Sequence, residues 1–476
     1  MSRVLEPQLS FADLELSHLG VQLDPTLRGI VDFLEVRPAL VEHVRRDLER
    51  GLKNPGAGRN GISPEQTLRS LLLMRVKNWD YRELRERIND GYTLRGFTLF
   101  DSHRVPLHDA FNRAFMRLTP ETMQSLNQAV VQAAVQLELE DGKKLRVDTT
   151  VVETNIHYPT DATLLWDSVR TLTRMVGELH EQLPNGVKGF TNRSKSARRR
   201  MQEIERMTAS QRQQQQTPKY RELLSIAGKV VAGARRVAAN AQRVKKVDAV
   251  TAAKILSLRQ QIGHYGKLAD QVIDQTRRRV LEGEQVPTEE KVYSIFEPHT
   301  DLIIRGKILK PVEFGHKVFL AESGHGLITQ YRVLDGNPAD QGQVKASLNR
   351  HTAVFHQAPE IYSGDRGFFN DENLQTCRTA GVSLACIPFA GGKPNPEREA
   401  VQKTPAFKRG QRFRAGIEGR ISVLFRGRGM KRARVEGRER FELFVGAAVL
   451  ANNLMVIAEL MRQRAEKAAR RRARAA

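Results

Sequence analysis

The sequence predicts a mixed α+β protein, with a helical N-terminal part and a mixed sheet that carries packed helices. Two observations predict this class. Strand-like and helix-like segments alternate after residue 340, as in sheets covered by helices. A long helical block at 162–290 separates the first strand-like segment from the rest. The 476 residues suggest about three domains at roughly 150 residues each. With 40% hydrophobic and 28% charged residues, the chain can bury a core.

Residues 27–140 are predicted to be helical. Ser63-Pro64-Glu65-Gln66 has the form of a capping box with proline at the first helical position. A second helix is expected to begin near Asp80 and to end at Gly91, and a third to begin at Thr119-Pro120-Glu121. Short helices joined by tight turns suit a helix-turn-helix-like DNA-binding module, although most small helical domains are not one.

Several segments rich in β-branched residues predict strands. The first, residues 143–154, is expected to form one strand or two joined by a bend. Four later segments are short and bounded by Gly, Asp or Pro, which predicts an antiparallel meander: 291–296, 301–306, 315–322 and 327–334.

The remaining elements follow in alternation. Helices are expected at 341–355 and 370–381, strands at 360–365 and 382–388, a loop at 390–399, and helices through 418–426 and 439–460. The predicted parts are therefore a helical domain (1–140), the first part of the core (141–161), a helical insertion (162–290), the rest of the core (291–460) and a basic tail (461–476). The tail is expected to be mobile unless DNA orders it.

The chain is strongly basic, and its charge is concentrated. Lys and Arg number 77 against 54 Asp and Glu, a formal charge of +23. Residues 187–246, 401–440 and 461–476 carry net charges of +13, +10 and +6, so the rest of the chain is slightly acidic. One such run could be a solvated helix face. Three together predict contact with nucleic acid.

Other features exclude whole classes of protein. No apolar run approaches the roughly 18 residues that span a bilayer, and the N-terminus lacks a signal-peptide pattern, so a soluble intracellular protein is expected. Two cysteines, Cys377 and Cys386, rule out a disulfide framework and a four-cysteine zinc site. The phosphate-binding pattern GxxxxGK[ST] is absent, so no nucleotide cofactor is expected.

Three acids lie in basic or apolar surroundings. Asp148 lies in the first strand, Asp365 ends the strand at 360–365, and Glu418 is the one acid in a basic helical stretch. Each has a local alternative role. Asp148 could be a turn or cap residue, Asp365 could pair with Arg366, and Glu418 could pair with Arg414 one helical turn earlier.

Taken together, the three acids predict a metal site. In a sheet with helices around it, carboxylates from two strands and a helix can converge on one point. Two divalent metal ions about 3.5–4 Å apart need such carboxylates to hold the attacking and leaving oxygens of a phosphate. Magnesium takes few protein carboxylates and completes its shell with water and phosphate oxygens.

At these residues the chain resembles the ISNCY-like DDE transposases of bacterial insertion sequences, whose catalytic core is ribonuclease-H-like. The resemblance covers roughly residues 30–455. The segments that carry it are 62–88 and 105–115 for the DNA-binding domain, and 147–169, 361–370, 412–437 and 446–454 for the catalytic core. The first and last core segments are the most specific.

The resemblance implies a function. The protein would bind the terminal inverted repeats of its element as double-stranded DNA, cut them to release a 3′-hydroxyl, and join that end to target DNA. Asp148, Asp365 and Glu418 would be catalytic and would hold two Mg²⁺ ions, with Mn²⁺ able to substitute. A dimer or larger assembly is expected, in the bacterial cytoplasm near the nucleoid and away from membranes. The candidates for holding phosphates are Arg366, Arg414, Arg426 and Lys317.

The chain departs from the pattern of this family at two positions. The family places a tyrosine three residues before the arginine and a lysine seven after the glutamate. Here those positions hold Gln411 and Phe425, with Phe413 and Arg426 nearby. These departures concern the positioning of DNA more than the metal site.

Two alternative functions stay open. One is a transposase-derived DNA-binding protein without catalytic activity, which retention of all three acids disfavours. The other is a nuclease that hydrolyses DNA without joining strands. Only the reaction products separate the nuclease from a transposase, because the metal chemistry is shared.

Overall fold

The computed structural model describes residues 22–54, 61–183, 189–242, 247–304 and 312–475. The chain divides into two compact units. Unit 1 comprises Met1–Glu153 and His316–Ala476, and unit 2 comprises Thr154–Gly315. Unit 1 therefore holds all three of the predicted acids, and unit 2 holds the whole of the expected helical insertion.

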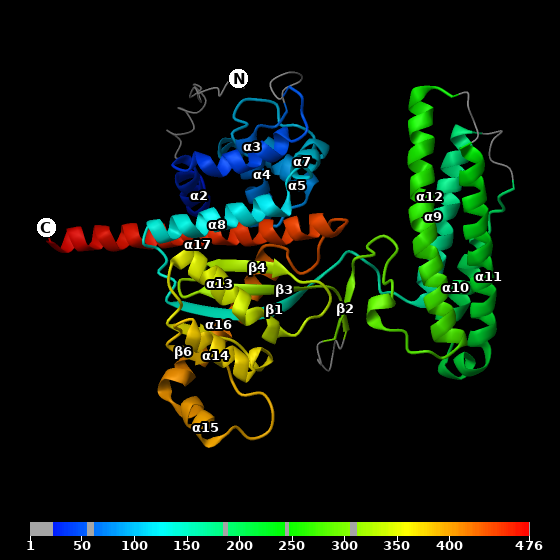
Figure 1. Ribbon diagram of the computed structural model, residues 1–476. Helices are drawn as coiled ribbons and strands as arrows, with labels where there is room; N and C mark the ends of the chain where they lie inside the picture. Colours follow the sequence, from blue (N-terminus) through cyan, green and yellow to red (C-terminus); the bar gives the residue numbers. More distant parts are fainter. Residues whose placement is uncertain (1–21, 55–60, 184–188, 243–246, 305–311, 476) are drawn as a thin grey trace. The chain divides into compact units, whose positions relative to one another are not determined.

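The N-terminal part of unit 1 is helical, as predicted (Figure 1). Side chains of Ser63, Asp80 and Thr119 cap three of these helices at the expected positions, and Gln66 completes the capping box. The helices are α2 (Pro25–Glu35), α3 (Pro38–Glu49), α4 (Pro64–Lys77), α5 (Tyr81–Asp90), α6 (Tyr92–Thr98), α7 (His108–Phe115) and α8 (Pro120–Gln136).

One long helix, α17 (Arg438–Ala475), completes this helical layer. It packs against α2, α4 and α8, and its apolar residues share one core with those helices. By length and composition α17 could span a membrane, contrary to the sequence-based expectation. Its apolar window is 72% buried, which is typical of a core helix in a soluble protein.

The sheet is mixed, as predicted. Its strands are β1 (Lys144–Glu153), β2 (Asp301–Ile304), β3 (Val312–Ser323), β4 (Ile328–Val333), β5 (Ile361–Ser363) and β6 (Leu384–Cys386). The order is β2-β3-β1-β5-β6, with β4 paired to β3. Strands β2, β3 and β4 pair antiparallel, which confirms the meander for these three, whereas β1, β5 and β6 pair in parallel.

Helices cover the sheet of unit 1. A core of apolar side chains lies between the strands and α13 (Val344–Phe355) and α14 (Asp371–Thr379). A separate core joins β1, β3 and β4 to α16 (Pro405–Gly427) and to the start of α17. Short 3₁₀ turns, η3 (Asp340–Gln343) and η4 (Arg366–Phe368), precede α13 and α14.

Two expectations about single elements were wrong. Residues 291–296 form no strand, because the side chain of Gln275 donates to the Val292 carbonyl and accepts from its amide, which removes both from sheet pairing. The predicted loop at 390–399 runs into α15 (Pro396–Lys403), which Asn395 caps. The segment at 143–154 forms one strand, the first of the two possibilities that the sequence left open. In the basic tail the chain continues as the helix α17.

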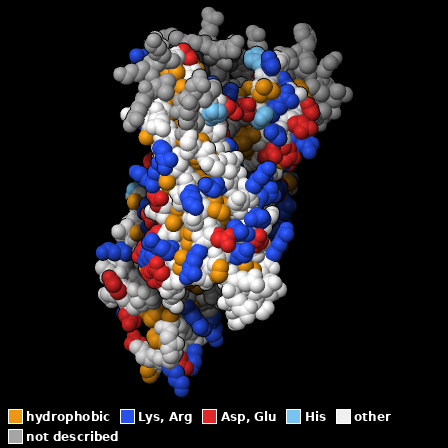
Figure 2. Space-filling view, turned by 90° about the vertical axis from the view of Figure 1, so that its right-hand side faces the viewer, with side chains coloured by type: hydrophobic (Ala, Val, Ile, Leu, Met, Phe, Trp, Pro, Cys, Tyr) orange, Lys and Arg blue, Asp and Glu red, His pale blue; other side chains and the backbone are white. Residues whose placement is uncertain are grey.

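Unit 2 is a helical bundle with its own apolar core. Its helices are α9 (Asp161–Gln182), α10 (Ser194–Glu205), α11 (Ala209–Ala241) and α12 (Ala249–Thr276), followed by the π-helical turn η1 (Arg277–Leu281) and the short 3₁₀ turn η2 (Thr288–Glu290). Part of the basic charge here is neutralised within the bundle, where Glu203 pairs with Arg200 and Lys219. Figure 2 shows Lys and Arg spread over the viewed face with Asp and Glu among them.

Candidate functional site

The parallel pairing of β1 with β5 aligns two of the predicted acids. Arg146 pairs with Ser363 in the register of these strands. Asp148 lies two residues further along β1, and Asp365 lies two residues after Ser363, just beyond the end of β5. Because β1 and β5 run in the same direction, this register brings the two aspartates to the same level of the sheet.

Helix α16 brings the third acid to the same place. It packs against β1, β5 and β6. One guanidinium on this helix, that of Arg414, contacts all three acids. Its Nη2 lies 2.9 Å from Asp148 Oδ2 and 3.6 Å from Asp365 Oδ2, and its Nη1 lies 3.1 Å from Glu418 Oε1. The structure therefore gathers the three predicted acids around a single cation.

The three carboxylates form a gradient from the interior to the surface. The side chain of Asp148 is 12% exposed, that of Asp365 38% and that of Glu418 69%. Backbone amides orient the two aspartates, since Asp148 Oδ1 accepts from Thr149 and Asp365 Oδ1 accepts from Gly367. A ligand that entered from solvent would thus meet two aspartates that backbone amides hold in place, and Glu418, whose exposed side chain is free to adjust.

Two of the three alternative local roles of these acids are realised at least in part. Glu418 does pair with Arg414 one turn earlier, as the spacing suggested. Asp365 caps the short turn η4. These contacts coexist with the convergence, because Arg414 also reaches Asp148 and Asp365.

Of the other residues predicted to lie at the site, two are at the surface and one is not. Arg366 and Arg426 are exposed, and Arg426 donates to the Ser422 hydroxyl. Lys317 is only 12% exposed in its side chain and pairs with Asp340 at 2.7 Å. Its ammonium also donates to the carbonyl of Pro338 at 2.8 Å. The ammonium of Lys317 is therefore already held by Asp340 and by the Pro338 carbonyl.

The partner of Lys317, Asp340, is a fourth carboxylate that the sequence-based reasoning missed. Its Oδ1 accepts from the Thr149 hydroxyl at 3.0 Å. A Cβ built on Gly367 would lie 3.0 Å from Asp340 Oδ2 and 3.1 Å from Asp365 Oδ1. Asp340 therefore lies beside the residues that follow both catalytic candidates. Its only sequence signal was a turn after Gly336, which says nothing about its neighbours in space.

Gln411 occupies the place where the family pattern has tyrosine. Its side-chain amide donates to the carbonyls of Gly364, at 3.3 Å, and Cys386, at 2.5 Å. These carbonyls follow β5 and end β6, so Gln411 anchors α16 across the two strand ends. Gln411 therefore helps to position α16 against the ends of β5 and β6.

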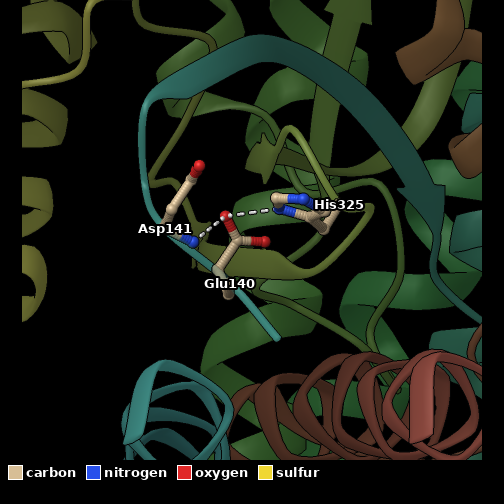
Figure 3. A group of neighbouring side chains, drawn as sticks. All are labelled: Glu140, Asp141 and His325. Atoms are coloured by element: carbon tan, nitrogen blue, oxygen red, sulfur yellow. Dashed lines mark hydrogen bonds and ion pairs between the residues drawn. The ribbon is translucent and has the colours of Figure 1, made fainter. Parts of the chain in front are cut away.

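A second acidic group has a different character (Figure 3). Potential metal-ligand atoms of Glu140, Asp141 and His325 lie within 4.8 Å of one another. Among the described residues, this is the group of acids and histidine close enough together to hold a metal ion. Glu140 Oε1 accepts from the amides of Asp141 and Gly142, at 3.1 and 3.0 Å, and Oε2 accepts from the Ser323 hydroxyl. Both oxygens already hold the loop that precedes β1, which explains the cluster without a metal ion.

Comparisons with known proteins add no family assignment. Neither protein family models nor curated proteins nor solved structures match this chain. The function is therefore inferred from the residues and their geometry.

Proposed function

We propose that this protein is a metal-dependent DNA transposase that binds the terminal repeats of its insertion sequence, cuts them and transfers the free end to target DNA. The observation that carries the proposal is the convergence of Asp148, Asp365 and Glu418 on the Arg414 guanidinium. These acids lie far apart in the sequence. The local folding of each segment does not explain why all three contact one guanidinium. The resemblance to DDE transposases names the same three residues.

The donor set fits magnesium. Three carboxylates against one guanidinium leave an excess of negative charge, and hard oxygen ligands are those that Mg²⁺ and Mn²⁺ prefer. Asp148 and Asp365 would hold metal from the sheet edge, and Glu418 would complete a second site from α16. Two bound Mg²⁺ ions would lower the pKa of the attacking water and neutralise charge on the phosphate.

The residues around the acids would hold the DNA. Lys408, Arg409 and Arg412 are exposed on α16 within three turns of Glu418. Arg366 directly follows Asp365, Arg426 lies on α16 after Glu418, and both arginines are exposed. Because fixed cations release counterions from the phosphate backbone, such a surface favours duplex DNA without reading its sequence.

Arg414 would have two states in this proposal. In the protein alone, its guanidinium balances the charge of the three acids. When metal ions take over that role, the same guanidinium would be free to hold a DNA phosphate beside them. The side chain would thereby couple the loading of metal to the binding of substrate.

Other parts of the proposal concern the assembly. The N-terminal helices would recognise the repeat sequence, a dimer or larger assembly would hold two element ends together, and the reaction would take place on chromosomal DNA in the bacterial cytoplasm. The alternative, a DNA-binding protein without activity, shares the basic surface. The presence of all three acids favours the enzyme, because DNA binding alone has no use for converging carboxylates.

The test is cleavage of labelled DNA that carries the repeats flanking the element, with Mg²⁺ or Mn²⁺. We expect the wild type to cut at the repeat end and to form joined products. Asp148→Asn, Asp365→Asn and Glu418→Gln should bind the repeats and leave them uncut. These substitutions keep side-chain shape and remove the charge that a metal ion needs.

The matched control is Glu397→Gln, which removes an exposed acid of unit 1 in the first turn of α15. It should cut as the wild type does. If a catalytic variant still cuts, that acid is misassigned. If the wild type binds repeats and cuts with neither metal, the DNA-binding alternative replaces the enzyme. Cleavage without joined products would identify a nuclease.

A further inference from the structure

A buried ion-pair cluster lies next to the site without belonging to it. Glu322, near the end of β3, has a side chain that is 0% exposed. Arg146 of β1 donates to its Oε2, with Nε at 2.8 Å and Nη2 at 2.7 Å. Arg420 of α16 donates through Nε to Oε1 at 2.8 Å. One carboxylate thus joins two strands and a helix.

The cluster contacts α16 on both sides of the segment that carries Arg414 and Glu418. Arg146 also donates through Nη1 to the carbonyl of Phe413 at 2.8 Å, and its guanidinium lies 4.8 Å from the centroid of the Phe413 ring. Phe413 immediately precedes Arg414, and Arg420 follows Glu418 by two residues. The segment that carries Arg414 and Glu418 is therefore held at its two ends.

The strand side of the cluster is equally close to the site. Arg146 precedes Asp148 by two residues on β1, so both side chains lie on the same face of the sheet. Helix α16 has a glycine, Gly416, where any Cβ would collide with the Arg146 guanidinium. The helix can therefore approach the strand closely enough for Phe413 to accept its hydrogen bond.

We propose that Glu322 is a positioning residue for the proposed metal site, setting α16 against β1 so that Glu418 meets Asp148. This inference rests on the proposed function. A buried carboxylate between two arginines costs much desolvation, and a hydrophobic contact would stabilise the fold as well. What the ion pairs add is direction, because Arg146 donates along fixed lines to the Glu322 carboxylate and the Phe413 carbonyl, and Arg420 donates to the same carboxylate. Glu322 touches neither metal nor DNA in this scheme.

The test measures Mn²⁺ binding to the full-length protein by the loss of the free-ion electron paramagnetic resonance signal, in the absence of DNA. Asp148→Asn should abolish binding at the site. Glu322→Gln should weaken Mn²⁺ binding by roughly tenfold, the usual scale for residues that orient metal ligands. Its affinity for duplex DNA should stay unchanged, since the exposed cations of α16 remain.

A second variant and a control separate positioning from general loss of stability. Arg420→Gln removes one arm of the cluster and leaves Glu322 paired with Arg146, so it decides the question if Glu322→Gln does not fold. In the double variant the two effects should be less than additive. Asp161→Asn removes a comparable carboxylate, 10% exposed and paired with Arg279 at 3.0 Å in unit 2. It should leave Mn²⁺ binding intact.

The outcomes distinguish the two proposals. If the wild type binds no Mn²⁺ that depends on Asp148, the proposed function fails. If that binding exists and Glu322→Gln and Arg420→Gln both retain wild-type affinity, the positioning role of Glu322 is overturned. If Asp161→Asn weakens Mn²⁺ binding as much as Glu322→Gln does, the effect is one of stability and the inference is also wrong.

Discussion

At the scale of single residues, the arrangement around Arg414 shows how one cation can organise several acids. The guanidinium has several N–H donors in a fixed plane, so it can contact carboxylates from a strand, a strand end and its own helix at once. Asp148 is the least exposed of the three and Glu418 the most. A metal site with this design would have a fixed half on the sheet and an adjustable half on α16.

A buried histidine offers a prediction about pH. His351 of α13 is 0% exposed and stacks on Phe355 with 4.5 Å between ring centroids. Burial lowers the pKa of His351 to about 4 from its usual 6.5. Below pH 6.5 the unfolded chain therefore takes up a proton that the folded protein does not, and stability falls as the pH drops towards 4. From pH 7 to pH 5 this loss should be about 2 kcal/mol.

The measurement is the free energy of unfolding in urea at both pH values. His351→Leu removes the titrating group and should show a smaller loss between pH 7 and pH 5 by about that amount. An equal pH dependence in the variant and the wild type would contradict the assignment of this loss to His351.

At the scale of elements, α16 is the part of unit 1 on which the site depends. Its contacts with the strands are close because glycines face them. At Gly410 a Cβ would collide with Cys386 Sγ and would lie 2.9 Å from Cys386 Cβ. At Gly419, on the same helix, a Cβ would meet nothing within 4 Å. The same substitution, glycine to alanine, therefore tests close packing of α16 at Gly410 and serves as its own control at Gly419.

Gly410→Ala should destabilise the protein by about 1–3 kcal/mol, since an overpacked contact forces the helix away from β6. Gly419→Ala should have the opposite sign, with a gain of up to about 1 kcal/mol from helix propensity. Urea unfolding midpoints of both variants check the pair. Equal stability of the two variants would show that α16 does not approach the sheet as closely as described.

At the scale of the whole molecule, helix α17 connects regions that are distant in sequence. Its middle residues share a core with the N-terminal helices, and Asn453 donates to Asn127 at 2.7 Å and to the carbonyl of Ile328 at 2.8 Å. Its last turns leave that core and are exposed from Gln463 onward among the described residues. The helix is thus apolar where it packs and basic where it projects.

This division predicts the effect of removing the basic end. Residues 467–476 contain five Lys or Arg and no acid. Their deletion should leave the unfolding midpoint unchanged, because residues 467–474, the part of the segment whose burial the structure describes, are all exposed. The slope of log affinity for duplex DNA against log salt should become shallower by roughly 0.9 for each phosphate that the shortened protein no longer binds. Fluorescence anisotropy from low to high salt measures the slope.

An internal control for this prediction is a variant in which the five basic residues of the segment are replaced by glutamine and the length is kept. It should reproduce the deletion. If the slope stays that of the wild type in both variants, the projecting end of α17 takes no part in DNA binding.

Local signals in the sequence determined much of this protein. The capping residues Ser63, Asp80 and Thr119 predicted their helices because a cap acts on amides two or three positions away. The alternation of elements predicted the mixed sheet, and the chemistry of Asp148, Asp365 and Glu418 singled them out as candidates. The strand predicted at 291–296 failed for the converse reason, since a distant side chain, Gln275, took its backbone bonds.

Only the tertiary structure decided how the candidates meet. The register of β1 on β5 aligned the two aspartates, and the packing of α16 added Glu418 and Arg414. The tertiary structure also brings Asp340 close to the residues that follow the two aspartates. It shows that Lys317, a sequence-based candidate for holding phosphate, forms an ion pair with Asp340. Residues 340 and 149 are far apart in the chain, and no short-range pattern records that their side chains form a hydrogen bond, because strand order and packing bring them together.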